Sequence, residues 1–322
     1  MKSFKTLDEQ LEILKSRGLL FSDEDSAKKQ LSFYGYYEII NGYKDFLLEK
    51  PVLKTEEEKF IKNSTFDHIY SLFVMDKTLI SAVIDATCDI EMFMRAVTAY
   101  VISKNISEDD KIYLSRRHYA SGKKNKNGKG AKIDQLITKF HKIINDDIEP
   151  MKHYRESHQN VPPWIMLKGS SFGNLVNFYK LQKPKNKAEI VSMMLGIPKE
   201  MVTNEEVSMF TDMIFLCHSY RNRAAHGGRM YNYRSIKSSI RFNRNFHLRA
   251  NVTEADYRNG KGQSCLGTLY QSLTWFDNQV AMNQLRAGIY VALNNHLKIY
   301  PEDYDLIISE TNLDPNIFIE KI

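Results

Sequence analysis

The sequence predicts an all-α protein, and three observations lead to that class. Apolar residues recur every three or four positions through most of the 322 residues, as they do on one face of an amphipathic helix. Two of these runs follow a serine or threonine and a group of acidic residues, which is the pattern of a helix start. The alternation of apolar and polar residues that marks a β-strand occurs only in short, ambiguous stretches.

Composition limits the class further. With 43% hydrophobic and 26% charged residues, the chain can bury a sizeable core, which excludes disordered, collagen-like and low-complexity proteins. No stretch approaches the roughly 18 consecutive apolar residues of a membrane span. The first residues carry acidic side chains and lack the apolar centre of a signal peptide, so we expect a cytoplasmic protein without membrane contact.

The N-terminal segment, residues 1–60, is predicted to be helical and separate from the main core. A short helix is expected over residues 4–17, ending at Gly18. Ser22 stands before three acidic residues and is predicted to cap the next helix. A proline and a charge run then indicate a connector over residues 51–65.

The central segment, residues 61–245, is predicted to be the helical core. Its longest periodic run, residues 66–102, indicates one long amphipathic helix or two in tandem. Thr203 and Glu206 form a capping box, which predicts the start of another helix. Shorter helices are expected at residues 133–144, 172–181 and 187–195.

The remaining residues, 246–322, are predicted to form a C-terminal helical extension. One long helix is expected over about residues 268–297, and the acidic last twenty residues are expected to be a surface appendage. The three cysteines, Cys88, Cys217 and Cys265, are far apart and are expected in the core. Neither a histidine cluster with metal-ligand spacing nor a phosphate-binding glycine loop occurs, so no metal or cofactor is predicted.

Positive charge is concentrated in two stretches. Residues 115–132 contain seven Lys or Arg and no acid, and residues 219–249 contain eight and no acid, although the net charge of the chain is only +6. Such segregation favours a polyanionic partner, because neutralised phosphates release counterions. A flexible, solvated loop is the alternative interpretation of the first stretch.

The second stretch contains the residues that suggest chemistry. Arg221, Asn222 and His226 lie at the end of the helix that the capping box starts. In an ideal helix Arg221 and His226 would be offset by about 140° around the axis. They would therefore meet at one point only if the helix bends or a second copy faces it. A single arginine and histidine near each other is weak evidence by itself.

The pattern Arg-Asn-x-x-x-His resembles the active-site motif of the HEPN superfamily of ribonucleases. With its neighbours it resembles the hallmark of the bacterial Abi-like family (abortive infection, AbiD/AbiF), whose other blocks are matched in order by residues 33–46, 162–164 and 171–175. The sequence Asn-Gly-Tyr-Lys-Asp at 41–45 is closer to the AbiF branch. Gly227 and Gly228 depart from the family pattern, which has larger polar residues there, and could loosen the helix end.

The resemblance implies a HEPN-type helical bundle and a metal-independent endoribonuclease with Arg221, Asn222 and His226 as catalytic residues. Glu91 and Arg95 match the family's Glu-x-x-x-Arg helix and, with His218, are candidates for supporting roles. Histidine exchanges protons near neutral pH, and arginine suits a phosphate that gains charge. The products expected are a 2′,3′-cyclic phosphate and a 5′-hydroxyl.

The resemblance to AbiF also implies an anti-phage toxin restrained by a small noncoding RNA, as in a toxin–antitoxin pair, and a homodimer that joins two motifs. A non-catalytic RNA-binding protein of a ribonucleoprotein complex is the alternative. The candidate RNA-binding residues are Arg116, Arg117, Lys123, Lys124, Lys126, Lys129, Lys132, Arg229, Arg234, Lys237, Arg241 and Arg244.

Overall fold

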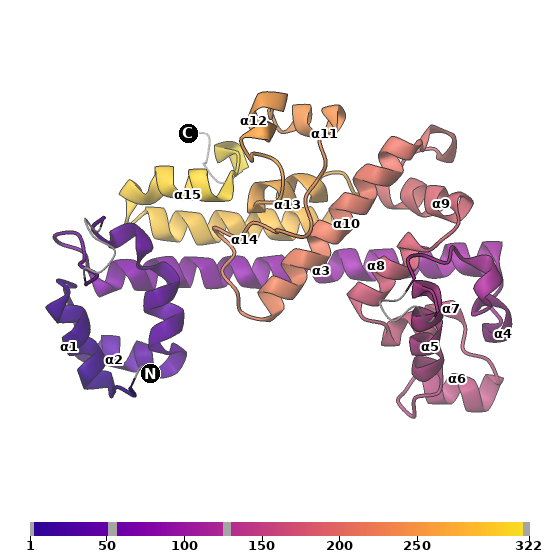
Figure 1. Ribbon diagram of the computed structural model, residues 1–322, viewed down its shortest axis with the longest axis horizontal. Helices are drawn as coiled ribbons and strands as arrows, with labels where there is room; N and C mark the ends of the chain where they lie inside the picture. Colours follow the sequence, from indigo (N-terminus) through magenta and orange to yellow (C-terminus); the bar gives the residue numbers. More distant parts are fainter. Residues whose placement is uncertain (1–2, 51–56, 125–129, 318–322) are drawn as a thin grey trace.

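The computed structural model describes residues 3–50, 57–124 and 130–317, and Figure 1 shows their arrangement. The predicted all-α class is confirmed, since this part of the chain holds helices and only three isolated β-bridges. The helices are arranged around one long central helix, α3 (Phe66–Asn105).

α3 is a single helix of 40 residues, as one of the two sequence-based alternatives had it. Thr65 caps its first turn by accepting a hydrogen bond from the amide of His68. α14 (Val280–Leu297) packs along α3 and approaches it closely at Gly288, where an added Cβ would lie only 2.2 Å from the Cβ of Ala82. The absence of a side chain at this glycine therefore sets how tightly the two helices pack.

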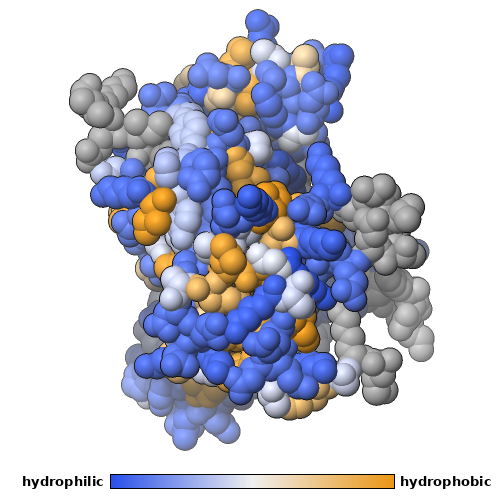
Figure 2. All heavy atoms as spheres, turned by 90° about the vertical axis from the view of Figure 1, so that its left-hand side faces the viewer, coloured by the Kyte–Doolittle hydropathy of each residue, from blue (hydrophilic) through white to orange (hydrophobic). Residues whose placement is uncertain are grey.

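The N-terminal helices pack at one end of α3 (Figure 1). Asp23, and not Ser22, caps α2, because the Ser22 hydroxyl is bound to Asp67 instead. The surface at this end is mainly hydrophilic, with small separate hydrophobic patches (Figure 2). The elements here are α1 (Leu7–Ser16), α2 (Glu24–Tyr34), the π-helix η1 (Tyr37–Asn41) and η2 (Asp45–Leu47).

A second group of short helices packs at the opposite end of α3 (Figure 1). It includes the predicted helices near residues 133–144, 172–181 and 187–195, which appear with slightly shifted ends. The elements are α4 (Asp110–Tyr113), η3 (Arg116–His118), α5 (Lys132–Ile144), α6 (Met151–His158), α7 (Pro163–Met166), η4 (Leu167–Gly169), α8 (Phe172–Lys180), α9 (Pro184–Leu195) and η5 (Lys199–Met201).

α10 (Asn204–Ala225) crosses α3 obliquely, and its C-terminal end lies between the two groups in the view of Figure 1. The capping box of Thr203 and Glu206 is present as predicted. Beyond it lie α11 (Arg244–Arg249), α12 (Glu254–Arg258), α13 (Leu266–Leu273), η6 (Pro301–Asp303), α15 (Tyr304–Thr311) and η7 (Pro315–Ile317).

The prediction of one helix over residues 268–297 is wrong, because the chain leaves the helix between α13 and α14. The amide of Asp277 donates to the carbonyl of Met194 on α9, and the Asn278 side chain accepts from the amide of Val280. The apolar Trp275 and Phe276 continue the helical period through this break, which is why the pattern conceals it.

A single hydrophobic core runs through all three predicted segments. The acidic C-terminal region contributes to it through Ile307 and Leu313, so the expectation of a mere surface appendage is wrong. Cys217 and Cys265 are buried in line with the prediction, and Cys88 is half-buried. Among the described residues, none of the helices combines the length and the apolar character that crossing a bilayer requires.

Candidate functional site

The Arg-Asn-x-x-x-His motif lies at the C-terminal end of α10, and the structure ends that helix in a defined way. Ala225 is the last helical residue, and His226 follows as the C-cap. The amides of Gly227 and Gly228 then donate, each at 2.9 Å, to carbonyls of the final turn, which is the pattern of a Schellman motif. Gly227 has φ = +67°, a conformation that disfavours any other residue. The glycines therefore fix the helix end instead of loosening it.

The position of His226 at the C-cap leaves its side chain exposed. The imidazole has no hydrogen-bond partner among the described residues, so it is available to a ligand. The amide of His226 still donates to the carbonyl of Asn222 at 3.2 Å, so the offset of about 140° from Arg221 that an ideal helix gives still applies at this residue. Arg221 turns to α3 and there meets Glu91.

Glu91 is the centre of a small ion-pair network. Its Oε1 atom lies 2.6 Å from Nη2 of Arg95, one turn along α3, and its Oε2 atom lies 4.0 Å from Nε of Arg221 on α10. Burial raises the pKa of the Glu91 carboxyl, and the two arginines oppose this effect. Arg95 also donates to the carbonyl of Ser170 at 3.4 Å. The predicted supporting pair thus contacts the motif and the segment before α8.

Asn222 is positioned by the histidine one turn earlier. Its Nδ2 atom lies 2.9 Å from Nε2 of His218, which is half-buried. Burial lowers the pKa of His218, and the charge of Arg221 lowers it further, so the neutral ring can accept this hydrogen bond. Gly173 on α8 lies against the same ring, since an added Cβ would come within 2.9 Å of Nε2. A side chain at Gly173 would displace His218 and with it Asn222.

A buried carboxylate that the sequence analysis did not single out fixes the segment after His226. Asp76 on α3 is fully buried and accepts hydrogen bonds from the amides of Met230 (3.0 Å) and Tyr231 (2.7 Å). The hydroxyl of Tyr43 donates to it at 2.7 Å. Burial raises the pKa of Asp76, while these three donors favour its charged form. Tyr43 is therefore a buried structural donor.

The tyrosine-rich N-terminal block contacts the same segment after His226. Arg229 donates from Nη1 to the carbonyl of Gly42, so this arginine is engaged with the protein itself. The ring of Tyr43 stacks on that of Tyr231 at 5.9 Å. Three blocks that are far apart in the sequence (residues 41–43, α3 and residues 229–231) thus meet beside the end of α10.

All of these contacts fall within residues 29–232, and this range matches the family model described as Abi-like protein. The match covers more than half of the chain. The chain belongs to the Abi-like protein family. Membership indicates abortive infection as the biological setting. No curated protein and no solved structure matches the chain.

In this Abi-like protein the basic stretch at residues 115–132 contributes to a cluster of lysines that also includes side chains of α5 and α8. Burial lowers the pKa of Lys132, and the charges of Lys180, Lys123 and Lys139 lower it further, which places four ammonium groups close together. Lys132 and Lys139 donate to side chains of α8, the helix that also contacts His218. The lysine cluster (Lys123, Lys132, Lys139 and Lys180) and the motif helix therefore both contact α8.

The other basic candidates differ in whether they already form an ion pair within the protein. Arg116 pairs with Asp134, and Arg241 is bound to Asp212 through 2.8 Å and 3.0 Å contacts. Both arginines therefore form ion pairs within the protein. Lys126 and Lys129 lie outside the described residues. The exposed candidates are Arg117, Lys123, Lys124, Arg234, Lys237 and Arg244.

One group of side chains in the described part of the Abi-like chain could hold a metal ion. Nε2 of His68 and Nε2 of His296 lie 2.7 Å and 2.9 Å from Oδ2 of Asp303, and all three residues are buried. These separations are those of hydrogen bonds, and Ser71 bonds Nδ1 of His296 at 2.9 Å. We interpret the group as a network that ties η6 and α14 to α3. It lies 23 residues along α3 from Glu91, about 35 Å at the helical rise.

Proposed function

We propose that this Abi-like protein is an anti-phage toxin of the AbiF-like branch and acts as a HEPN-type endoribonuclease without a metal ion. One observation carries the proposal. At the end of α10, Arg221 is oriented by Glu91 and Asn222 by His218, next to an exposed histidine whose helix end is fixed by glycine. Catalysis requires side chains that are held in position in this way.

The chemistry follows from these residue types. RNA supplies its own nucleophile, the 2′-hydroxyl. His226 would accept the proton of that hydroxyl or protonate the leaving 5′-oxygen, a role that typically contributes about 10²–10⁴-fold in rate. The guanidinium of Arg221 would stabilise the charge that develops on the phosphate, and Asn222 would hold a phosphate oxygen. Cleavage by this route leaves a 2′,3′-cyclic phosphate and a 5′-hydroxyl.

A homodimer completes the proposal. One chain offers a single exposed motif histidine, but cleavage uses both a general base and a general acid. A two-fold dimer that brings two α10 ends together would supply the second imidazole. Crosslinking or scattering of the RNA-free protein tests this part independently of activity.

The proposed partner is a small structured noncoding RNA that restrains the toxin. The lysine cluster, with the exposed Lys124 and Arg117 beside it, supplies the positive surface for the RNA backbone. This assignment predicts that a discrete RNA co-purifies with the protein and is released by high salt. Neutralising Lys123, Lys124 and Lys139 together should abolish co-purification, and retention of the RNA would contradict the assignment.

A non-catalytic RNA-binding protein is the second candidate, and one observation favours it. Arg221 and Asn222 already have partners in Glu91 and His218, so the motif could grip a phosphate without cutting the chain. In that case His226→Ala would weaken RNA binding, and no preparation would cleave RNA.

The test compares RNA cleavage by RNA-stripped wild type, His226→Ala and Arg286→Ala. Arg286 is an exposed arginine of α14, outside the motif and outside the candidate RNA-binding residues, and serves as the control. The nuclease proposal predicts that His226→Ala loses at least a hundredfold in cleavage rate and that Arg286→Ala changes little. Equal rates for His226→Ala and wild type would overturn it.

A further inference from the structure

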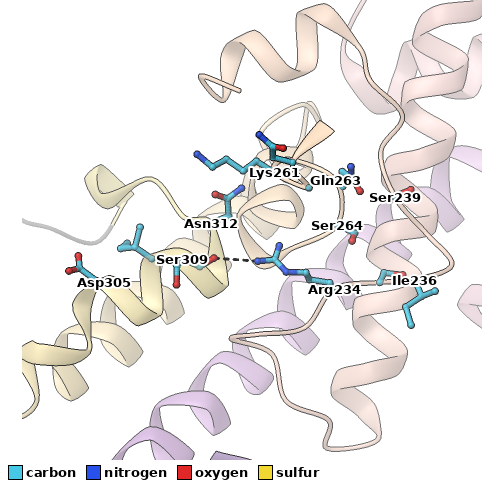
Figure 3. Close-up of a pocket in the computed structure, with 13 residues that line it drawn as sticks. Arg234, Ile236, Ser239, Lys261, Gln263, Ser264, Asp305, Ser309 and Asn312 are labelled. Carbon is cyan, nitrogen blue, oxygen red and sulfur yellow. Dashed lines mark hydrogen bonds between the residues drawn. The ribbon is translucent and has the colours of Figure 1, made fainter. Parts of the chain in front are cut away.

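A pocket of about 830 Å³ is lined in part by the chain segment that follows the motif (Figure 3). Three segments form its walls, residues 234–239, residues 259–264 and one side of α15. Its volume falls within the range of small-molecule sites. Neither the motif nor the lysine cluster contributes a residue to its lining.

The side chains around the pocket combine one fixed cation with free amides. The Arg234 guanidinium donates from Nη2 to the carbonyls of Ser309 and Glu310, at 3.3 Å and 3.4 Å, which holds its fork at the pocket wall. Its Nε and Nη1 atoms have no partner among the described residues. Such a preorganised fork suits the oxygens of a phosphate.

The amide side chains of Asn259 and Asn312 line the same pocket, and neither makes a hydrogen bond within the described part of the chain. Free amide groups of this kind read the polar edge of a base. Ile236 at the rim is completely exposed, and an aliphatic side chain there can cover the face of a bound base. Lys261, paired with Asp256 at 3.3 Å, and the carboxylate of Asp305 are the other charged groups of the lining.

The walls of the pocket are tied to the helix that carries the motif. The buried hydroxyl of Tyr220 lies 3.0 Å from the carbonyl oxygens of Tyr233 and Ser264 and can donate its one hydrogen to either. Ser264 lines the pocket, and Tyr233 directly precedes the wall of residues 234–239. The hydroxyl of Ser219 bonds that of Ser235 at 2.8 Å. Ser219 and Tyr220 directly precede Arg221, so a ligand in this pocket contacts segments that are bonded to the motif helix.

We infer that this pocket binds a nucleotide, with its phosphate on Arg234 and its base between Ile236 and the amides of Asn259 and Asn312. The nucleotide is either free or an unstacked residue of the bound RNA. The RNA source rests on the proposed function, whereas binding of a free nucleotide does not.

Equilibrium dialysis of the RNA-stripped protein with each of the four ribonucleoside monophosphates tests the inference, with inorganic phosphate as a separate probe. Ser309→Leu fills the pocket without changing charge, and Arg234→Ala removes the phosphate anchor. Both variants should raise the nucleotide Kd at least tenfold, while Arg286→Ala, at an exposed position of α14 outside the pocket, should stay within twofold of wild type. Thermal unfolding of each variant shows whether the fold is kept, and Arg234→Lys keeps the charge if Arg234→Ala does not fold.

A second arm distinguishes the two sources of the nucleotide. RNA carrying 4-thiouridine is crosslinked to the His226→Ala protein, and the attached peptides are identified by mass spectrometry. An RNA ligand predicts crosslinks within residues 234–239 or 259–264 that Ser309→Leu removes. Absence of both nucleotide binding and crosslinks there, or equal binding by Ser309→Leu and wild type, overturns the inference. If wild type still cleaves RNA in that case, only the pocket assignment fails; if the pocket binds nucleotides but no RNA is bound or cleaved, the proposed function fails instead.

Discussion

Replacing Asp76 by alanine should cost more stability than any other single change near the motif. The substitution leaves three buried donors, the amides of Met230 and Tyr231 and the hydroxyl of Tyr43, without their acceptor. Each unsatisfied donor costs about 1–3 kcal/mol, and the variant recovers the cost of burying a charge, which is several kcal/mol. Three donors left unsatisfied at about 1–3 kcal/mol each outweigh that recovered cost, so the expected net loss is about 3 kcal/mol.

Urea unfolding of wild type, Asp76→Ala, Tyr43→Phe and the double variant measures this loss. Tyr43→Phe removes one donor from an intact acceptor and should cost about 1 kcal/mol. In the Asp76→Ala background the same change removes an orphaned hydroxyl and should be neutral or stabilising. The reasoning is refuted if Asp76→Ala costs less than about 1 kcal/mol, or if Tyr43→Phe costs the same in both backgrounds.

Three further predictions concern the ends and partners of the motif. Gly227→Ala should cost about 1 kcal/mol in urea unfolding, because alanine disfavours φ = +67°, and it should slow RNA cleavage by moving His226. Burial raises the pKa of Glu91, so its contribution to stability is present below about pH 4.3 and is lost as pH rises through the raised pKa. Glu91→Gln should remove this fall in stability when the free energy of unfolding is measured at a series of pH values. The pKa of His218 is lowered, so stability should fall as pH drops below about 6.5, and His218→Gln should flatten that dependence.

Each of these has a plain counter-result. An unchanged unfolding free energy for Gly227→Ala would mean that the helix end tolerates a side chain. A stability profile for Glu91→Gln parallel to that of wild type would show that another group titrates in that range. A stability profile for His218→Gln that is parallel to that of wild type between pH 5 and 7 would likewise show that another group titrates there.

The long helix, the capping box and the motif helix could be predicted because local chemistry determines them. Apolar periodicity is uninterrupted across α3, and Thr203 with Glu206 forms a cap from residues three apart. The break between α13 and α14 could not, because it depends on a contact between Asp277 and the carbonyl of Met194 on α9. Tertiary contacts of this kind leave no periodic trace in the sequence.

The residues of the candidate site likewise differ in whether they can be predicted from the sequence. The catalytic candidates and the Glu91–Arg95 pair are visible as a motif and as an i,i+4 spacing. Asp76 gave a signal that was overlooked, since it is an acidic residue on the apolar face of α3 between Leu72 and Leu79. The network of His68, His296 and Asp303 had no such signal, because its members are joined only by the packing of α14 on α3.

The central claim is that the end of α10 cleaves RNA through its own side chains. The most direct test is the chemistry of the RNA ends produced in EDTA by RNA-stripped protein, with His226→Ala and Arg286→Ala beside wild type. The account predicts 2′,3′-cyclic phosphate and 5′-hydroxyl ends from wild type and Arg286→Ala and none from His226→Ala. Cleavage that stops in EDTA, or 5′-phosphate ends, would contradict it.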